Sequence, residues 1–150
     1  MVDIGSGYVD ASGNKRGALL RMSADGIKFG RGIVDPSGNK AGGMLTTGPE
    51  GINMTRGLQD VSGNKVAEGL ATRAEGVVVA RGIEDAFGNK VGVIAAKGAN
   101  KAAWAGGIED RFGNKIGIAL DLDELSHTLT IRSNFLGHIS ESTISLPVNG

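Results

Sequence analysis

A nine-residue motif, G-x-x-D-x-x-G-N-K, occurs five times in this chain of 150 residues, always 25 residues apart. The copies begin at Gly7, Gly32, Gly57, Gly82 and Gly107. A constant period means that one structural unit is repeated, and a unit this small buries its apolar surface only against its neighbours. We therefore expect an elongated molecule rather than a globular domain with a single central core.

Within each repeat, apolar residues alternate with other residues, which is the pattern of a half-buried β-strand. In the segment 27–33 the apolar side chains fall at Ile27, Phe29 and Ile33, on one face of an extended chain. The pattern predicts strands of about eight residues. The residues expected to line a shared interior are Ile27, Phe29, Ile33, Ile52, Met54, Leu58, Val77, Val79, Ile83, Trp104 and Ile108.

The D-x-x-G-N part of the motif has the chemistry of a tight turn. Aspartate opens a type I turn, and the glycine after it supplies the positive φ of a three-residue hairpin loop with a glycine bulge. A second turn in each of the first three units combines an acidic residue with glycine, as in Asp25-Gly26. The residues assigned to the motif turns are Asp10, Gly13, Asn14, Asp35, Gly38, Asn39, Asp60, Gly63, Asn64, Asp85, Gly88, Asn89, Asp110, Gly113 and Asn114.

The repeat divides the chain into three expected parts. Residues 1–6 are a lead-in, residues 7–118 are a five-repeat β shaft, and residues 119–150 form a C-terminal cap or tip, because the repeated text stops near residue 120. The fold class expected is all-β: an elongated fibre of 25-residue repeats with a small β cap.

Two constructions of such a fibre remain open. One chain can coil as a parallel β-solenoid, or three chains can form an intertwined trimeric β-prism or triple β-helix. Small residues dilute the apolar pattern, for example at Gly42-Gly43 and Ala95-Ala96. A narrow axis shared by three backbones tolerates this dilution, so the trimer is favoured.

Charge and composition exclude several functional classes. Sixteen basic and sixteen acidic residues give a net charge of zero, which removes the electrostatic argument for nucleic acid or for an anionic membrane. The chain has no cysteine, so disulfides and thiolate metal sites are excluded. No apolar run approaches the roughly 18 residues of a membrane span.

Paired carboxylates occur at Glu84-Asp85 and Glu109-Asp110, and such pairs are what a glycoside-cleaving enzyme needs. However, the aspartate recurs in all five repeats, as a turn requires and a single active site does not. We therefore expect no catalytic residues and no enzymatic activity.

Metal and cofactor sites are not expected either. The loops lack the spacing and the distal glutamate of a calcium loop. His127 and His138 are eleven residues apart without a third ligand, and we interpret them as ordinary residues of a polar cap. No glycine-rich segment ends in the Lys-Ser/Thr of a phosphate-binding loop. Trp104 is interpreted as a core side chain.

The G-[LI]-x-D-x-x-G-N sequence between short strands resembles the repeats of bacteriophage tail-fibre and other virion appendage proteins. The resemblance covers residues 7–118. It implies a homotrimeric shaft that serves as a non-enzymatic structural spacer and attachment element of a virus particle, assembled in the host cytoplasm beside other virion proteins. Two alternatives stand next to it: a tail spike that binds a host-surface glycan through its last 30 residues, and a monomeric bacterial β-solenoid adhesin.

Overall fold

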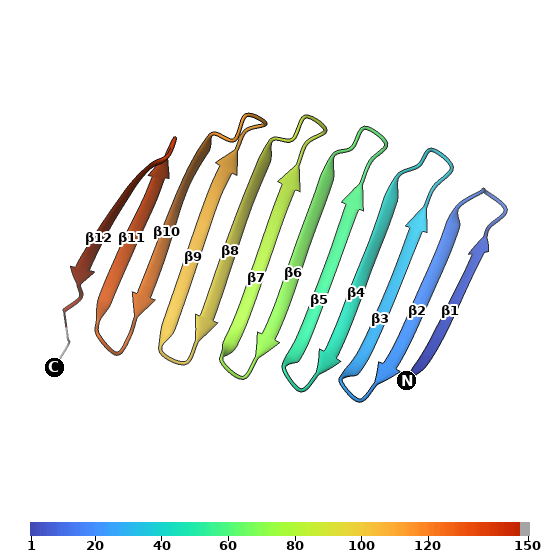
Figure 1. Ribbon diagram of the computed structural model, residues 1–150, viewed down its shortest axis with the longest axis horizontal. Helices are drawn as coiled ribbons and strands as arrows, with labels where there is room; N and C mark the ends of the chain where they lie inside the picture. Colours follow the sequence, from blue (N-terminus) through green and yellow to red (C-terminus); the bar gives the residue numbers. More distant parts are fainter. Residues whose placement is uncertain (148–150) are drawn as a thin grey trace.

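The computed structural model describes residues 1–147, which form a single sheet of consecutive antiparallel strands (Figure 1). Each strand pairs with the strands before and after it in the chain, so the sheet order is the sequence order. None of these residues belongs to a helix that could cross a membrane. The strands are β1 (Val2–Val9), β2 (Lys15–Ser23), β3 (Gly26–Val34), β4 (Lys40–Gly48), β5 (Gly51–Gln59), β6 (Lys65–Arg73), β7 (Gly76–Glu84), β8 (Lys90–Gly98), β9 (Lys101–Glu109), β10 (Lys115–Asp123), β11 (Thr128–Phe135) and β12 (His138–Ser145).

The 25-residue period is one β-hairpin and its connections. In the second repeat, β3 and β4 have nine residues each, residues 35–39 form the loop between them, and residues 49–50 form the turn to β5. The D-x-x-G-N loops all lie along one border of the sheet, at the top of Figure 1. The two-residue turns lie along the other border. At Gly51, the first residue of β5, a glycine is required: its φ is 120°, and a Cβ there would lie 1.9 Å from the carbonyl oxygen of Thr72.

The all-β prediction is confirmed, and the parallel solenoid is wrong. A solenoid requires each repeat to pair in parallel with the next, whereas every strand pair among residues 1–147 is antiparallel. The period itself could not separate the two, because a hairpin and a solenoid coil of this length return the chain to an equivalent position.

The segment boundaries expected at residues 6 and 118 fall inside strands. β1 begins at Val2, and β10 continues to Asp123. The last two strands then extend the same sheet, and β10 pairs with β11 along its length. The end of the repeated text therefore marks a change of sequence and loop type within one continuous sheet. Residues 148–150 of the expected cap lie outside the described residues.

Alternation along the strands gives the sheet two different faces. Residues directly opposite on neighbouring antiparallel strands share a face, and the strand registers place all eleven predicted interior residues on one of them. We call it the apolar face. Its most regular row crosses ten strands and consists of Leu20, Phe29, Leu45, Met54, Leu70, Val79, Ala95, Trp104, Leu120 and Ile131.

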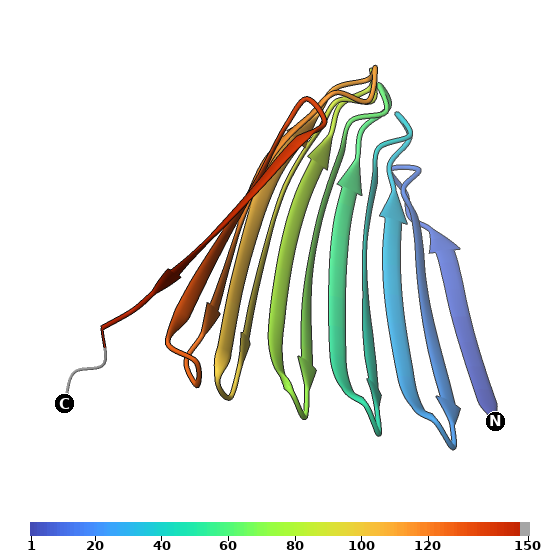
Figure 2. The ribbon, with the colours of Figure 1, turned by 60° about the vertical axis from the view of Figure 1, so that its left-hand side comes forward.

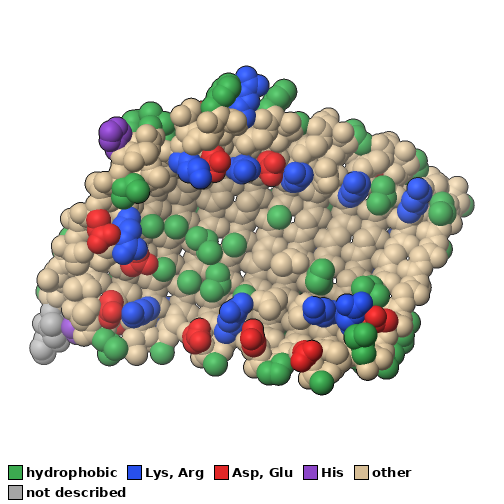
Figure 3. All heavy atoms as spheres, in the orientation of Figure 1, with side chains coloured by type: hydrophobic (Ala, Val, Ile, Leu, Met, Phe, Trp, Pro, Cys, Tyr) green, Lys and Arg blue, Asp and Glu red, His purple; other side chains and the backbone are tan. Residues whose placement is uncertain are grey.

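The opposite face carries mostly small and charged side chains, and we call it the glycine face. Figure 3 shows it, with lysines and carboxylates along the upper border and much bare backbone in the middle. One row on this face is Gly7, Gly17, Gly32, Gly42, Gly57, Ala67, Gly82, Gly92, Gly107 and Gly117.

Within residues 1–147 nothing covers either face, so this part of the chain has no core. Figure 2 shows a single bent layer, and no residue of the described chain is buried. The accessible surface is 10480 Å². A compact monomer of this mass exposes about 7,100 Å². The chain thus leaves about 3,300 Å² open that a compact fold hides, and large residues such as Phe29 and Trp104 are 41% and 40% exposed.

Candidate functional site

Each D-x-x-G-N loop is closed by its own aspartate and asparagine. In the third loop, the Asp60 carboxylate accepts the Asn64 backbone N–H at 2.9 Å and the Asn64 side-chain amide at 2.6 Å. The backbone N–H of Gly63 donates to the Asp60 carbonyl, and that of Asp60 donates to the Asn64 carbonyl. The other four loops repeat these backbone bonds.

The glycines of these loops have the positive φ that the turn pattern predicts. The values lie between 83° and 96° for Gly13, Gly38, Gly63, Gly88 and Gly113. Together with the backbone bonds, they form the type I turn and glycine bulge of a three-residue hairpin loop. The structure thus places the fifteen assigned turn residues in five equivalent loops.

These hydrogen bonds set the charge state of the loop aspartates. The side-chain amide of the loop asparagine lowers the pKa of the aspartate most, against the opposing effect of desolvation, and backbone N–H groups lower it further. A carboxylate that accepts several N–H bonds is favoured in its ionised form. The loop aspartates are therefore anionic acceptors rather than proton donors.

The asparagines also join each loop to the next, a role that the sequence did not reveal. The side-chain oxygen of Asn64 accepts the backbone N–H of Ala86 at 2.9 Å. Asn39 and Asn89 make the same bond to the following loop. The first step is missing because Pro36 occupies the donor position and has no N–H. The motif alone carries no signal for this bond, because the bond depends on which hairpins are neighbours in the sheet.

The carboxylate pairs weighed as catalytic residues point into different surroundings. Asp85 accepts the backbone N–H groups of Phe87 and Asn89 within its loop, whereas Glu84 lies on the glycine face, 3.5 Å from the Lys65 ammonium. Asp110 and Glu109 repeat the arrangement, with Lys115 at 3.3 Å from Glu109. A glycosidase general acid needs a raised pKa, and both loop aspartates have a lowered one.

The residues weighed as metal ligands are dispersed. His127 lies in the turn before β11 and His138 begins β12, so the two histidines stand at opposite ends of β11. Among residues 1–147, no three His, Cys, Asp or Glu side chains are grouped as metal ligands. In three of the loops, the asparagine oxygen that a calcium site would use already accepts an N–H bond.

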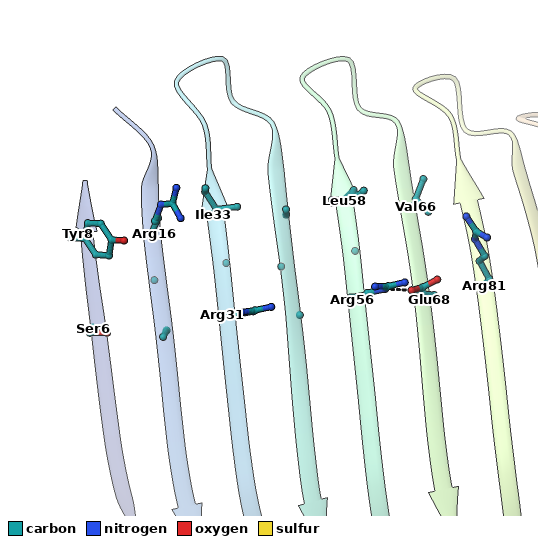
Figure 4. A pocket seen from close by; sticks show the side chains of 17 residues that line it. Ser6, Tyr8, Arg16, Arg31, Ile33, Arg56, Leu58, Val66, Glu68 and Arg81 are labelled. Carbon is teal, nitrogen blue, oxygen red and sulfur yellow. Dashed lines mark hydrogen bonds and ion pairs between the residues drawn. The ribbon is translucent and has the colours of Figure 1, made fainter. Parts of the chain in front are cut away.

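The apolar face is hollowed near its N-terminal half by a groove of about 750 Å³ (Figure 4). Apolar side chains form one side of it, including Ile33, Leu58 and Val66. Along the other side runs a row of directly opposite residues, one from each strand from β3 to β7. We call it the arginine row; it consists of Arg31, Gly43, Arg56, Glu68 and Arg81.

Within residues 1–147, the arginine row forms one ion pair, between Arg56 and Glu68. Nε of Arg56 is hydrogen-bonded to the Glu68 carboxylate, the contact drawn as a dashed line in Figure 4. Arg31 and Arg81 have neither an ion pair nor a side-chain hydrogen bond within residues 1–147. Arg31 extends from β3 toward β4, where Gly43 contributes no side chain.

Comparison with protein-family models, curated proteins and solved structures gave no match to this chain. The exposed apolar face, the linked loops and the arginine row are thus the features from which its function can be inferred.

Proposed function

We propose that this chain is the shaft of a virion appendage: a non-enzymatic homotrimer in which three sheets pack with their apolar faces inward. The observation that carries the proposal is the uncovered apolar face. It presents large side chains from every strand, and a soluble protein covers such a surface with a partner.

The exposed area fits an obligate assembly of copies. If three chains hide the excess of about 3,300 Å² each, every chain-to-chain interface buries about 3,300 Å² in total, within the range of obligate interfaces. The face is continuous over ten strands, so the partner must have the same length. A second copy of this chain meets that requirement without further assumptions.

Strand pairing restricts how the copies assemble. Strands β2 to β11 are hydrogen-bonded on both sides by strands of their own chain. Among the strands of the described residues, only β1 and β12 keep one open edge, so interleaving strands from different chains in a triple β-helix is disfavoured. The arrangement that we propose is a β-prism in which each chain forms one whole side, with its strands perpendicular to the long axis.

We infer three chains, and a place in a virus particle, from the resemblance of the repeats to phage tail-fibre repeats. The role is then mechanical: a stiff spacer, assembled in the host cytoplasm, that joins or presents other virion proteins at its two ends. The loop aspartates support a role without catalysis, because their carboxylates are engaged in holding the turns.

Small-angle X-ray scattering of the purified chain tests the proposal. Twelve strands give a rod about 55 Å long, with three sides each about 30 Å wide. Scattering from a particle of this shape, with one dominant rod axis, is the expected result. A thin plate with the dimensions of one sheet would contradict it.

The proposed absence of enzymatic activity is tested separately. The purified protein is incubated with surface polysaccharides of bacteria and the product size is followed by chromatography. We expect no shortening. Depolymerisation that is lost when Glu84 and Asp85 are changed to Gln and Asn would overturn the proposal.

A further inference from the structure

We infer that the arginine row contains a binding site for a small oxyanion of the phosphate or sulfate type, located over Gly43 between Arg31 and Arg56. These three residues are direct neighbours: Arg31 lies opposite Gly43 on β4, which lies opposite Arg56 on β5. At a strand spacing of about 4.8 Å, the two arginine backbones are about 9.6 Å apart. That gap accommodates one tetrahedral anion between two guanidinium groups.

The next position between two arginines of the row already holds an anionic group. Between Arg56 and Arg81 the facing residue is Glu68, whose carboxylate is bonded to Arg56. At Gly43 the chain supplies the space but no carboxylate. Guanidinium groups bind tetrahedral oxyanions as they bind carboxylates, through paired N–H donors.

The chain cannot neutralise this row with another copy of the same face. Glu68 is the single carboxylate that the strand registers of residues 1–147 place on the apolar face. The same registers place five cationic side chains there: Arg16, Arg31, Arg56, Arg81 and Lys97. Arg16 is held by Asp10 of the first loop at 3.2 Å, and Lys97 by Glu124 of a turn.

A cation left unpaired inside an assembly is costly, because desolvation is not offset by a partner. If the apolar face is covered, Arg31 is therefore expected to bind an external anion that offsets its desolvation. The site is built within one chain, so it does not require the trimer. In the proposed shaft it would be enclosed, with one copy contributed by each chain.

The test is thermal unfolding of the full chain in sodium phosphate, compared with sodium chloride at equal ionic strength. At ten times the dissociation constant, phosphate is expected to raise Tm by about 3–6 °C, in a saturable manner. Arg31→Gln should abolish this rise. Lys40→Gln, which removes an equal charge from the glycine face, should keep it.

Glu68→Gln provides an independent check that does not weaken the site. It frees Arg56, the partner of Glu68, and should increase the phosphate-dependent rise. Calorimetric titration of the native protein with inorganic phosphate covers the case in which Arg31→Gln fails to fold. An equal rise in chloride, an unchanged rise in Arg31→Gln, or no heat of phosphate binding would overturn the inference.

A heparin-derived oligosaccharide separates a free anion from a sulfate on a larger ligand. Failure of the oligosaccharide to bind supports a small, enclosed anion, and binding tighter than that of phosphate contradicts it. Light scattering on the same samples keeps the two proposals apart. A trimer whose Tm does not rise with phosphate would contradict only the anion site. A phosphate-dependent rise in Tm without a trimer would contradict only the proposed shaft.

Discussion

At the level of single residues, the loops act as a connected series rather than as five separate turns. Each aspartate organises its own loop, and three of the asparagines also accept an N–H bond from the loop that follows. This geometry keeps successive hairpins at a fixed spacing along one border of the sheet.

The bond between loops can be measured by comparing two asparagines. Asn64→Ala removes the bonds to Asp60 and the bond from Ala86, whereas Asn14→Ala removes only the bonds to Asp10, because Pro36 donates nothing. We expect Asn64→Ala to lower the free energy of unfolding by about 0.5–1.5 kcal/mol more than Asn14→Ala does. Denaturant unfolding gives both values, and equal losses would mean that the bond contributes nothing.

The lowered pKa of the loop aspartates predicts acid sensitivity. A carboxylate whose folded pKa lies below its unfolded value of about 3.9 stabilises the fold above that value, and the stabilisation is lost as pH falls through the folded pKa. Asp60→Asn should therefore be less stable than the native chain at pH 7, with a smaller difference at pH 3. Thermal unfolding at the two pH values checks this, and a constant difference would refute it.

Sequence was a good guide to these loops because turn chemistry is local. The aspartate, the glycine with positive φ and the asparagine act within five residues, so the motif contains the information. The bond from Asn64 to Ala86 spans 22 residues and depends on which hairpins are neighbours. That information lies in the strand pairing, which the motif does not specify.

At the level of elements, the repeat is a hairpin in which both strands place alternate residues on the apolar face. Alternation predicted the apolar face correctly, since a period of two is a property of any extended strand. It did not predict the groove. Arg31, Arg56 and Arg81 each directly precede the first glycine of a motif copy in the sequence, but their place beside Gly43 and Glu68 required the register.

Removing one whole unit tests the repeat as an element. Deleting residues 51–75 joins Glu50 to Gly76, so β4 would pair with β7 through the same kind of turn and in the same register. We expect a folded sheet with two strands fewer and an unchanged far-UV CD spectrum per residue. Inserting one alanine after Val79 is the contrasting change. It moves the rest of β7 to the wrong face and should abolish assembly.

At the level of the whole molecule, we expect the stability of the sheet to depend on covering the apolar face. A single layer gains hydrogen bonds and little burial, and the described chain has no buried residue. Hydrophobic burial is the largest favourable contribution to folding. Folding and association are therefore expected to be coupled in one transition.

Substitutions at two adjacent residues of β6 test whether the apolar face, rather than the glycine face, is the covered one. Leu70 lies on the apolar face opposite Val79, and Ala71 lies on the glycine face opposite Val78. Leu70→Lys places a charge in the shared interior and should dissociate or unfold the protein, whereas Ala71→Lys should leave the assembly intact. Sedimentation velocity compares the two, and equal behaviour would mean that neither face is covered selectively.

The molar mass of the purified chain in solution, measured by light scattering during size exclusion, tests the central claim most directly. Three chains of 15.3 kDa give about 46 kDa, the value expected for a shaft with its apolar faces inward. A mass of about 31 kDa would indicate two sheets packed face to face and contradict the three-sided shaft. A well-folded monomer of 15.3 kDa would contradict the covered apolar face itself.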